Sequence, residues 1–278
     1  MENRKICLGL SKQEATPLTQ QLQVLKDTGF DGFFVVWDTR LDMDSLRQKA
    51  VELDMPFQSI HAPWDRSADL WRQDEPKAQL GVQELKDCID VCVRCGAPVM
   101  VAHVFIGFKE HDPTPLGLVR YGQVIDYARE KGIKIAFENT EGEEYLDMLM
   151  EHFQGDEAVG FCWDSGHEMC YNRSRDLLAD YGDHLICTHL NDNLGVCDPS
   201  GRISWLDDLH LLPFDGVADW QMIANRLQKC GFSGELTFEL SRFSKPGRNE
   251  NNSYKAMPYE AYIKEVFDRA CRVAELLK

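Results

Sequence analysis

Lys134-Ile135-Ala136-Phe137-Glu138-Asn139-Thr140 is a short apolar run that leads directly into a carboxylate, an amide and a hydroxyl. A short apolar run bounded by turn residues is typical of a buried strand. Such a strand would place Glu138 at the mouth of a hydrophobic core. We therefore predict that Glu138 is a metal ligand, and a candidate catalytic acid or base, at the centre of a ring of strand ends.

The same arrangement recurs along the chain. Eight short apolar runs are expected as strands: Ile6–Leu10, Phe33–Val36, Phe57–Ile60, Pro98–Ala102, Lys134–Phe137, Val159–Trp163, Leu185–Thr188 and Glu235–Phe238. Each is followed by a longer amphipathic run expected as a helix: Glu14–Asp27, Asp42–Leu53, Pro76–Cys95, Pro115–Lys131, Glu143–His152, Ser174–Tyr181, Trp220–Cys230 and Tyr259–Leu277. Strands that read as continuous apolar runs are typical of parallel sheets buried on both faces. The alternation predicts an α/β fold, a single (β/α)₈ TIM barrel that spans residues 1–278 as one domain.

Six successive predicted strands end on a residue of metal-ligand type: His61, His103, Glu138, Asp164, His189 and Glu239. The strand ends of a barrel converge on one axis, so these residues are expected to meet. Three further candidates accompany them: His167, Asp208 and His210. One such residue at a strand end is weak support for a site, but six in succession predict one. Mixed histidine and carboxylate ligands without cysteine suit Mn²⁺, Mg²⁺, Co²⁺, Fe²⁺ or Zn²⁺, and the pattern does not choose among these ions.

Composition and charge argue against several classes of function. Apolar residues make up 44% of the 278-residue chain, and the formal net charge is −16 with no run of Lys or Arg. This charge argues against broad nucleic-acid binding, because neutralising phosphates requires clustered cations. We find neither a signal peptide nor an apolar run long enough to span a bilayer, so we expect a cytoplasmic protein without a membrane partner. The ten scattered cysteines are expected to be reduced, with Cys88, Cys92 and Cys95 on one inward helix face.

Several motifs give the chain a family resemblance. They are Phe137-Glu138-Asn139, Trp163-Asp164-Ser165-Gly166-His167, Thr188-His189-Leu190-Asn191-Asp192-Asn193, the run from Asp208 to Trp220, and Gly234-Glu235-Leu236-Thr237-Phe238-Glu239. With them, the whole chain resembles the xylose isomerase-like barrel superfamily. That superfamily holds sugar phosphate isomerases and epimerases, inosose dehydratases and apurinic endonucleases of the endonuclease IV type. In the isomerase and epimerase branch, the resemblance implies one divalent metal ion held by Glu138, Asp164, His189 and Glu239, with His167 facing the substrate.

The resemblance implies a metal-dependent sugar (phosphate) isomerase or epimerase. Such an enzyme removes a proton next to a carbonyl and passes through a metal-stabilised enediolate, with Glu138 and Glu239 as the acid/base pair. Inosose-type dehydration would use the same carboxylates. The endonuclease branch is the other alternative, because all nine ligand types of its three-zinc centre are present. The surroundings of His61 and His103 lack that family's Gly/Ser-rich character, and the acidic balance is unhelpful for DNA.

Two long connections, Asn191–Asp219 and Ser241–Met257, are expected on the face of the barrel that carries the site. Five cations in loops of this face could hold a phosphate or a polyol of a small carbohydrate substrate, or could be ordinary solvated charges: Lys109, Arg202, Arg242, Lys245 and Arg248. Trp37 and Trp64 follow strand ends and could form an apolar wall against a sugar, or pack into the core. The final helix could serve a homo-oligomer interface.

Overall fold

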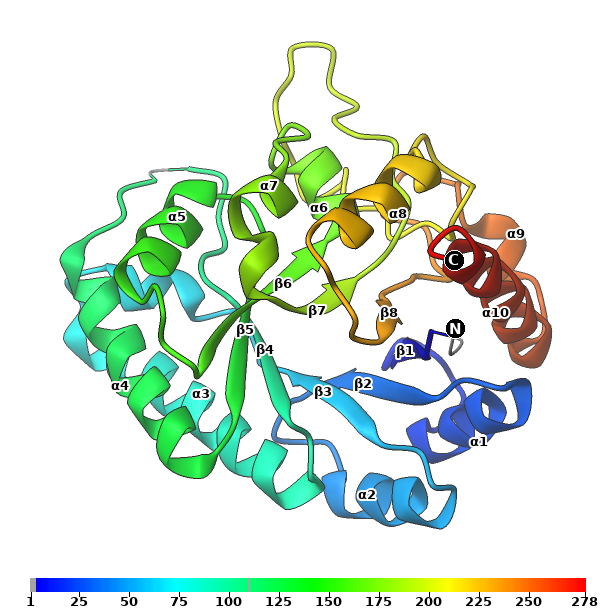
Figure 1. Ribbon diagram of the computed structural model, residues 1–278, viewed down its shortest axis with the longest axis horizontal. Helices are drawn as coiled ribbons and strands as arrows, with labels where there is room; N and C mark the ends of the chain where they lie inside the picture. The colour runs from blue at the N-terminus through cyan, green and yellow to red at the C-terminus, as the bar shows by residue number, and fades with distance from the viewer. Residues whose placement is uncertain (1–3, 110) are drawn as a thin grey trace.

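Eight parallel strands form a nearly closed barrel in the computed structural model, which describes residues 4–109 and 111–278 (Figure 1). The strands are β1 (Ile6–Leu10), β2 (Gly32–Val36), β3 (Phe57–His61), β4 (Val99–His103), β5 (Lys134–Glu138), β6 (Val159–Asp164), β7 (Leu185–His189) and β8 (Leu236–Phe238). They pair in the order β7-β6-β5-β4-β3-β2-β1-β8. The seam between β7 and β8 is joined by a parallel bridge between Leu190 and Phe238. The predicted α/β barrel is confirmed.

Helices follow the strands and cover the outside of the barrel. They are α1 (Leu18–Thr28), α2 (Met43–Glu52), α3 (Glu75–Cys95), α4 (Pro115–Lys131), α5 (Glu143–His152), α6 (Ser165–Cys170), α7 (Leu177–Tyr181), α8 (Trp220–Lys229), α9 (Asn252–Lys255) and α10 (Tyr259–Glu275). Two 3-10 helices, Ser67–Trp71 and Gly182–His184, complete the set. Aspartates begin several helices: the side chain of Asp42 accepts a hydrogen bond from the backbone N–H of Ser45 at the start of α2.

The first helix is shorter than predicted. The expected helix from Glu14 to Asp27 begins only at Leu18, because Pro17 adopts an extended conformation and cannot continue a helix toward the preceding residues. The segment from Glu14 to Thr16 is therefore a loop. It lies on the same side of the barrel as the candidate ligands.

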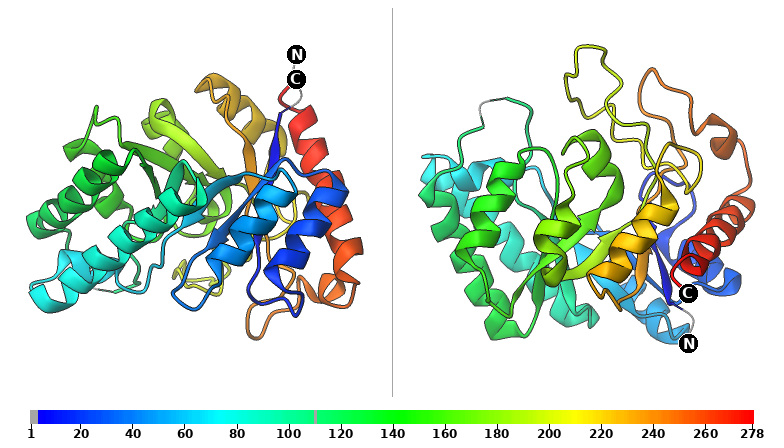
Figure 2. Two further views of the ribbon diagram at one scale, coloured as in Figure 1. Left: turned by 90° about the horizontal axis from the view of Figure 1, so that it is seen from below. Right: turned by 45° about the horizontal axis from the view of Figure 1, so that its top comes forward.

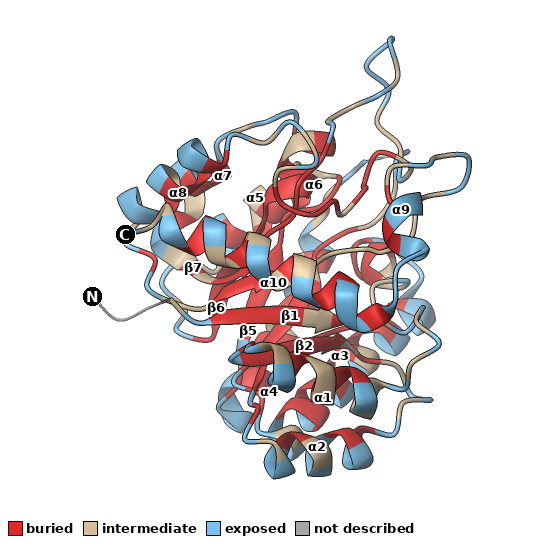
Figure 3. Ribbon diagram, turned by 90° about the vertical axis from the view of Figure 1, so that its right-hand side faces the viewer, coloured by how far each residue is buried: buried red, intermediate tan, exposed pale blue. Residues whose placement is uncertain are grey.

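The core lies on both faces of the strands (Figure 3). Phe33, Phe137 and Phe161 are fully buried between the barrel and its helices. Of the three cysteines predicted on one inward face of α3, Cys88 and Cys92 are buried, whereas Cys95 at the end of the helix is only partly buried. No described helix is long and apolar enough to cross a membrane.

The long loops after β7 and β8 extend on the same side of the molecule (Figure 2, right). The first projects farthest, at the top of Figure 1. The loops are joined at their bases, where the backbone N–H of Ser241 donates to the carbonyl oxygen of His210 at 2.9 Å. Within the first loop, Asp192 and Leu211 form an antiparallel bridge. These contacts bring the two loops together over the C-terminal ends of the strands.

Candidate metal centre

Glu138 ends β5 and lies fully buried among histidines from three other strands. Its Oε2 is 3.1 Å from Nε2 of His61 and 3.3 Å from Nε2 of His103. Its Oε1 is 3.0 Å from Nδ1 of His189. The barrel therefore brings three of the other five predicted strand-end residues around this one carboxylate.

A second group of ligands shares Glu138. One ligand atom from each of Glu138, Asp164, His189 and Glu239 lies within 4.8 Å of all the others. Nδ1 of His189 is 2.8 Å from Oε2 of Glu239, across the seam between β7 and β8. This group contains the four residues that the family resemblance assigns to one divalent metal ion.

The remaining candidates form a third group beside the second. Oδ1 of Asp208 is 3.4 Å from Nε2 of His167 and 3.0 Å from Nδ1 of His210. Nε2 of His210 lies 3.8 Å from Oε2 of Glu239. All nine residues singled out from the sequence as ligands thus come together at one end of the barrel.

Charges and burial set the protonation of these carboxyl groups. Burial acts to raise the pKa of Glu138, but His189 and the hydrogen bonds from the surrounding histidines hold it well below its usual range. Burial acts to raise the pKa of Glu239, but the charge of His189 and its hydrogen bond lower this pKa to about 2. Burial raises the pKa of Asp164 to about 6, although the charge of His167 acts to lower it. All three carboxyl groups are therefore ionised at neutral pH or close to it, and Glu138 and Glu239 in turn hold the pKa of His189 well above its usual range despite its burial.

Amide side chains hold Asp164 in place. The backbone N–H of Asp164 donates to Oδ1 of Asn139 at 2.8 Å, and Nδ2 of Asn139 donates to the carbonyl oxygen of Asp164 at 2.9 Å. Nδ2 of Asn191 lies 3.1 and 2.9 Å from the two carboxylate oxygens of Asp164. Asp164 also begins α6 by accepting from the backbone N–H of His167 at 2.6 Å. Hydrogen bonds of this kind orient metal ligands and tune their basicity.

Backbone carbonyls orient two of the histidine rings. Nδ1 of His61 is 2.7 Å from the carbonyl oxygen of Ala62, and Nδ1 of His167 is 3.0 Å from that of Asn139. A carbonyl oxygen can only accept, so Nδ1 carries the proton in both rings. This leaves Nε2 of His61 facing the carboxylate of Glu138, and Nε2 of His167 facing that of Asp208.

The donor set fits a divalent cation. Two buried carboxylates, Glu138 and Asp164, meet the partly buried carboxylate of Glu239, and like charges at this distance repel one another unless a cation compensates them. Several buried atoms have no hydrogen-bond partner among the described residues, including Nδ1 of His103, Nε2 of His189 and Oδ1 of Asp208. Mixed nitrogen and oxygen donors suit Zn²⁺, Mn²⁺, Co²⁺ and Mg²⁺.

A cavity of about 430 Å³ opens above the centre. Asp208, His210 and Glu239 line its inner end, and Trp64, Trp205 and Lys245 contribute to its walls. Of the predicted substrate-binding residues, Trp64 and Lys245 therefore lie at the cavity. The ring of Trp64 stacks on His103 with centroids 5.3 Å apart, which joins the cavity wall to the ligand set.

The other predicted substrate-binding residues lie away from this cavity. Trp37 is buried in the core. Arg202 pairs with Asp198 in the projecting loop, and Arg242 pairs with Glu14 at 2.9 Å. Arg248 pairs with Glu250, and Lys109 is exposed. All five side chains lie outside the lining of the cavity.

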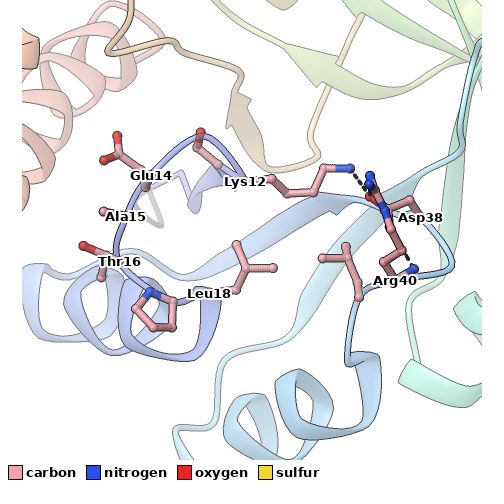
Figure 4. Close-up of a pocket in the computed structure, with 10 residues that line it drawn as sticks. Lys12, Glu14, Ala15, Thr16, Leu18, Asp38 and Arg40 are labelled. Carbon is pink, nitrogen blue, oxygen red and sulfur yellow. Dashed lines mark hydrogen bonds and ion pairs between the residues drawn. The ribbon is translucent and has the colours of Figure 1, made fainter.

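A second pocket of about 340 Å³ lies beside the cavity and shares Ser11 and Lys12 with it (Figure 4). The loop from Glu14 to Thr16 borders it. Nζ of Lys12 reaches Oδ2 of Asp38 at 2.8 Å, and Asp38 also pairs with Arg40. The charge of Lys12 is therefore satisfied away from the candidate metal ligands.

The model of the family described as xylose isomerase-like TIM barrel matches residues 22–265, most of the chain. The chain belongs to this family. Among curated proteins, the "Uncharacterized protein y4fM" of Sinorhizobium fredii (strain NBRC 101917 / NGR234) is 34% identical over 174 residues. That similarity covers 58% of this chain and 53% of the relative, so the chain matches about half the length of that protein.

Solved structures with this fold are similar over almost the whole chain. The IolI protein with a binding zinc atom has a TM-score of 0.75 at 18% identity, with 98% of each chain covered. D-allulose 3-epimerase from Methylomonas sp., in complex with D-allulose, has a TM-score of 0.71 at 15% identity, covering 99% of this chain and 96% of that one. The 3-keto-D-glucoside 4-epimerase YcjR from E. coli has a TM-score of 0.70 at 14% identity, covering 95% and 99%. At these identities the likeness shows a shared fold.

Three residues at the site were not found from the sequence. Phe34 stacks beneath His189 with centroids 4.6 Å apart, Asn191 bonds to Asp164, and Trp205 lines the cavity. Asn191 could have been found, because it follows His189 by two residues and so returns to the same side of the chain. Phe34 lies within an apolar strand and Trp205 within an irregular loop, and neither position carries a local signal of its role.

Proposed function

We propose that this protein is a metal-dependent sugar (phosphate) isomerase or epimerase. One observation carries the proposal: Glu138, Asp164, His189 and Glu239 offer ligand atoms within 4.8 Å of one another, directly below a cavity with aromatic and charged walls. Concave sites with a few convergent polar groups suit small molecules. The epimerases that share the fold make a carbohydrate substrate a consistent choice.

The chemistry requires removal of a proton from a carbon next to a carbonyl group. A bound divalent cation, held by the four residues, would polarise the carbonyl and stabilise the negative charge that develops beside it. Glu239 lines the cavity, so its carboxylate can reach a substrate carbon and accept the proton. Glu138 is its proposed partner for returning the proton. Positioned acid–base groups typically contribute about 10²–10⁴-fold to the rate.

The walls of the cavity would hold the substrate in place. The indole rings of Trp64 and Trp205 offer apolar faces for the C–H groups of a sugar ring, while His210 and Asp208 offer polar atoms for its hydroxyls. The loops after β7 and β8 supply most of these groups, and their contacts over the strand ends restrict access of water. A drier site strengthens the interaction between the charged groups and the substrate.

A second candidate is phosphodiester hydrolysis at a three-metal centre of the endonuclease type. A specific observation favours it: His61 and His103 meet Glu138, and His167 and His210 meet Asp208, so each flank of the central group has its own set of donors. The net charge of −16 opposes the approach of a DNA backbone. We rank this function second.

Hydrogen exchange between solvent and substrate tests the proposal. Metal-loaded protein is incubated in deuterated water with a panel of ketoses, keto-polyols and their phosphates, and deuterium in recovered sugars is measured by NMR. We expect incorporation at a carbon next to the carbonyl for one substrate class. Glu239→Gln should abolish it while the circular dichroism spectrum is unchanged, and Glu151→Gln, an exposed site on α5, should retain it.

Two results would contradict the proposal. Retained exchange in Glu239→Gln would remove Glu239 from proton transfer. Cleavage of an abasic-site duplex, together with three zinc ions per chain and no sugar exchange, would establish the second candidate instead.

A further inference from the structure

Lys245 places a fixed positive charge on the third group of ligands. Its Nζ is 3.1 Å from Oδ2 of Asp208. The other oxygen of the same carboxylate, Oδ1, is the one that faces His167 and His210, at 3.4 and 3.0 Å. Asp208 thus contacts a cation on one side and two imidazole nitrogens on the other.

The position of Lys245 is fixed from both ends of its loop. On one side, the backbone N–H of Ser241 donates to the carbonyl oxygen of His210 at 2.9 Å. On the other side, Nη1 of Arg248 lies 3.6 Å from Oδ1 of Asp207. Both anchors connect the loop after β8 to the segment that carries Asp208. The contact between Lys245 and Asp208 is therefore part of how the two loops fit together.

An aromatic ring holds the ammonium group from a further direction. Nζ of Lys245 lies 5.6 Å from the centroid of the ring of Trp205, within the range of a cation–π interaction. Lys245 and Asp208 are both largely shielded from solvent, with 23% and 12% of their side chains exposed. Screening by water and salt is weaker for such groups than for fully exposed charges.

A lysine and a divalent cation compete at a carboxylate of this kind. Asp208 contacts both His167 and His210, and Lys245 already neutralises its single negative charge. A divalent ion bound between Asp208, His167 and His210 would add two positive charges close to the ammonium, and Asp164, which also lies near both histidines, is shared with the central group. Repulsion at short range in a partly buried site is strong. The central group differs, because it offers three carboxylates.

We propose that Lys245 takes the place of a metal ion at the third group, so that Asp208, His167 and His210 hold no metal and face the substrate instead. This inference rests on the proposed function in one respect, namely that the central group around Glu138 binds the metal. It deepens that function by assigning the third group to substrate hydroxyls and by removing the three-metal chemistry that phosphodiester cleavage would use. Lys245 acts here as a positioning residue through Asp208.

Zinc binding to charge variants tests the inference without any measurement of activity. Metal-free wild-type protein, Lys245→Met and Lys245→Arg are titrated with zinc, and bound ions are counted by native mass spectrometry while affinities are measured by calorimetry. We expect Lys245→Met to bind one more zinc ion per chain than wild type, or to bind its last zinc at least tenfold more tightly. Lys245→Arg keeps the charge and should match wild type.

Two further variants locate the effect. Lys12→Met removes the other lysine of the same cavity, whose charge is satisfied by Asp38 rather than by a ligand, and it should bind zinc as wild type does. The double variant Lys245→Met/His210→Asn should lose the added zinc ion. Lys245→Gln, which keeps a polar group of similar length, repeats the test if the methionine variant does not fold.

The inference is overturned if neutral variants at position 245 bind no additional zinc and bind none more tightly. It is also overturned if wild type already binds three zinc ions with similar affinity, or if the added ion persists in the double variant. The test compares zinc binding between variants and needs no activity. Absence of sugar exchange would therefore contradict the proposed function, but it would not change the outcome of the zinc titrations.

Discussion

Asn191 is the residue that most directly controls the geometry of Asp164, because it donates to both carboxylate oxygens. We predict that Asn191→Ala weakens metal binding by about 10–100-fold, the usual effect of losing a hydrogen bond that orients a ligand. Calorimetric titration of metal-free protein measures this. Asn225→Ala, at an exposed position on α8, should bind metal as wild type does. An unchanged affinity in Asn191→Ala would show that Asp164 needs no such support.

The pKa of Asp164 predicts how the metal affinity depends on pH. Burial raises this pKa to about 6 in the metal-free protein, so the carboxyl group takes up a proton as the pH falls through that value. Metal ions bind the ionised form, and protons therefore compete with them. Proton uptake by Asp164 alone should lower the affinity by up to about tenfold for each pH unit below 6, and His189, whose pKa is raised well above its usual value by Glu138 and Glu239 despite burial, adds to this loss. Titrations between about pH 5 and pH 7 test this, and a constant affinity over that range would contradict it.

At the scale of elements, the junction between β6 and α6 depends on a close approach. A Cβ at Gly166 would lie 1.8 Å from Oδ1 of Asn191, so an added methyl group must displace that amide. We predict that Gly166→Ala lowers the free energy of unfolding by about 1–3 kcal/mol, the usual cost of overpacking. It should also weaken metal binding, because Asn191 holds Asp164. Denaturant unfolding and metal titration measure the two effects.

Gly122 in α4 is the matched control. A Cβ there would be 3.6 Å from the nearest side-chain atom, an ordinary contact. Gly122→Ala should therefore raise the free energy of unfolding by up to about 1 kcal/mol, because alanine favours a helix interior more than glycine does. Destabilisation by both substitutions, or by neither, would contradict the close packing of Gly166 as the cause.

The elements that carry the site were largely predictable, and the contacts between loops were not. β5 was expected to end beside Glu138, because an apolar run meets polar residues there, and the strand includes that residue as its last. α6 was missed, since Ser165-Gly166 resembles a loop and its six residues are too few to show a helical period. The contact between Trp205 and Lys245 joins two irregular loops that no local pattern relates.

At the scale of the whole molecule, closure of the barrel assembles the centre. The backbone of Leu190 forms two hydrogen bonds across the seam. Its N–H donates to the carbonyl oxygen of Thr237 at 2.8 Å, and its carbonyl oxygen accepts from the N–H of Glu239 at 3.2 Å. This pairing places His189 next to Glu239, although the long loop after β7 and helix α8 lie between them in the chain. Ligands from six strand ends can meet only when the eight strands close.

The most direct test of the account is the metal content of protein purified without chelators, measured by inductively coupled plasma mass spectrometry beside Glu138→Gln. We predict about one tightly held divalent ion per chain in wild type, and its loss in the variant, because Glu138 contacts the ligands on both sides of the central group. Wild-type protein that contains no divalent metal, and binds none when it is added, would contradict the account.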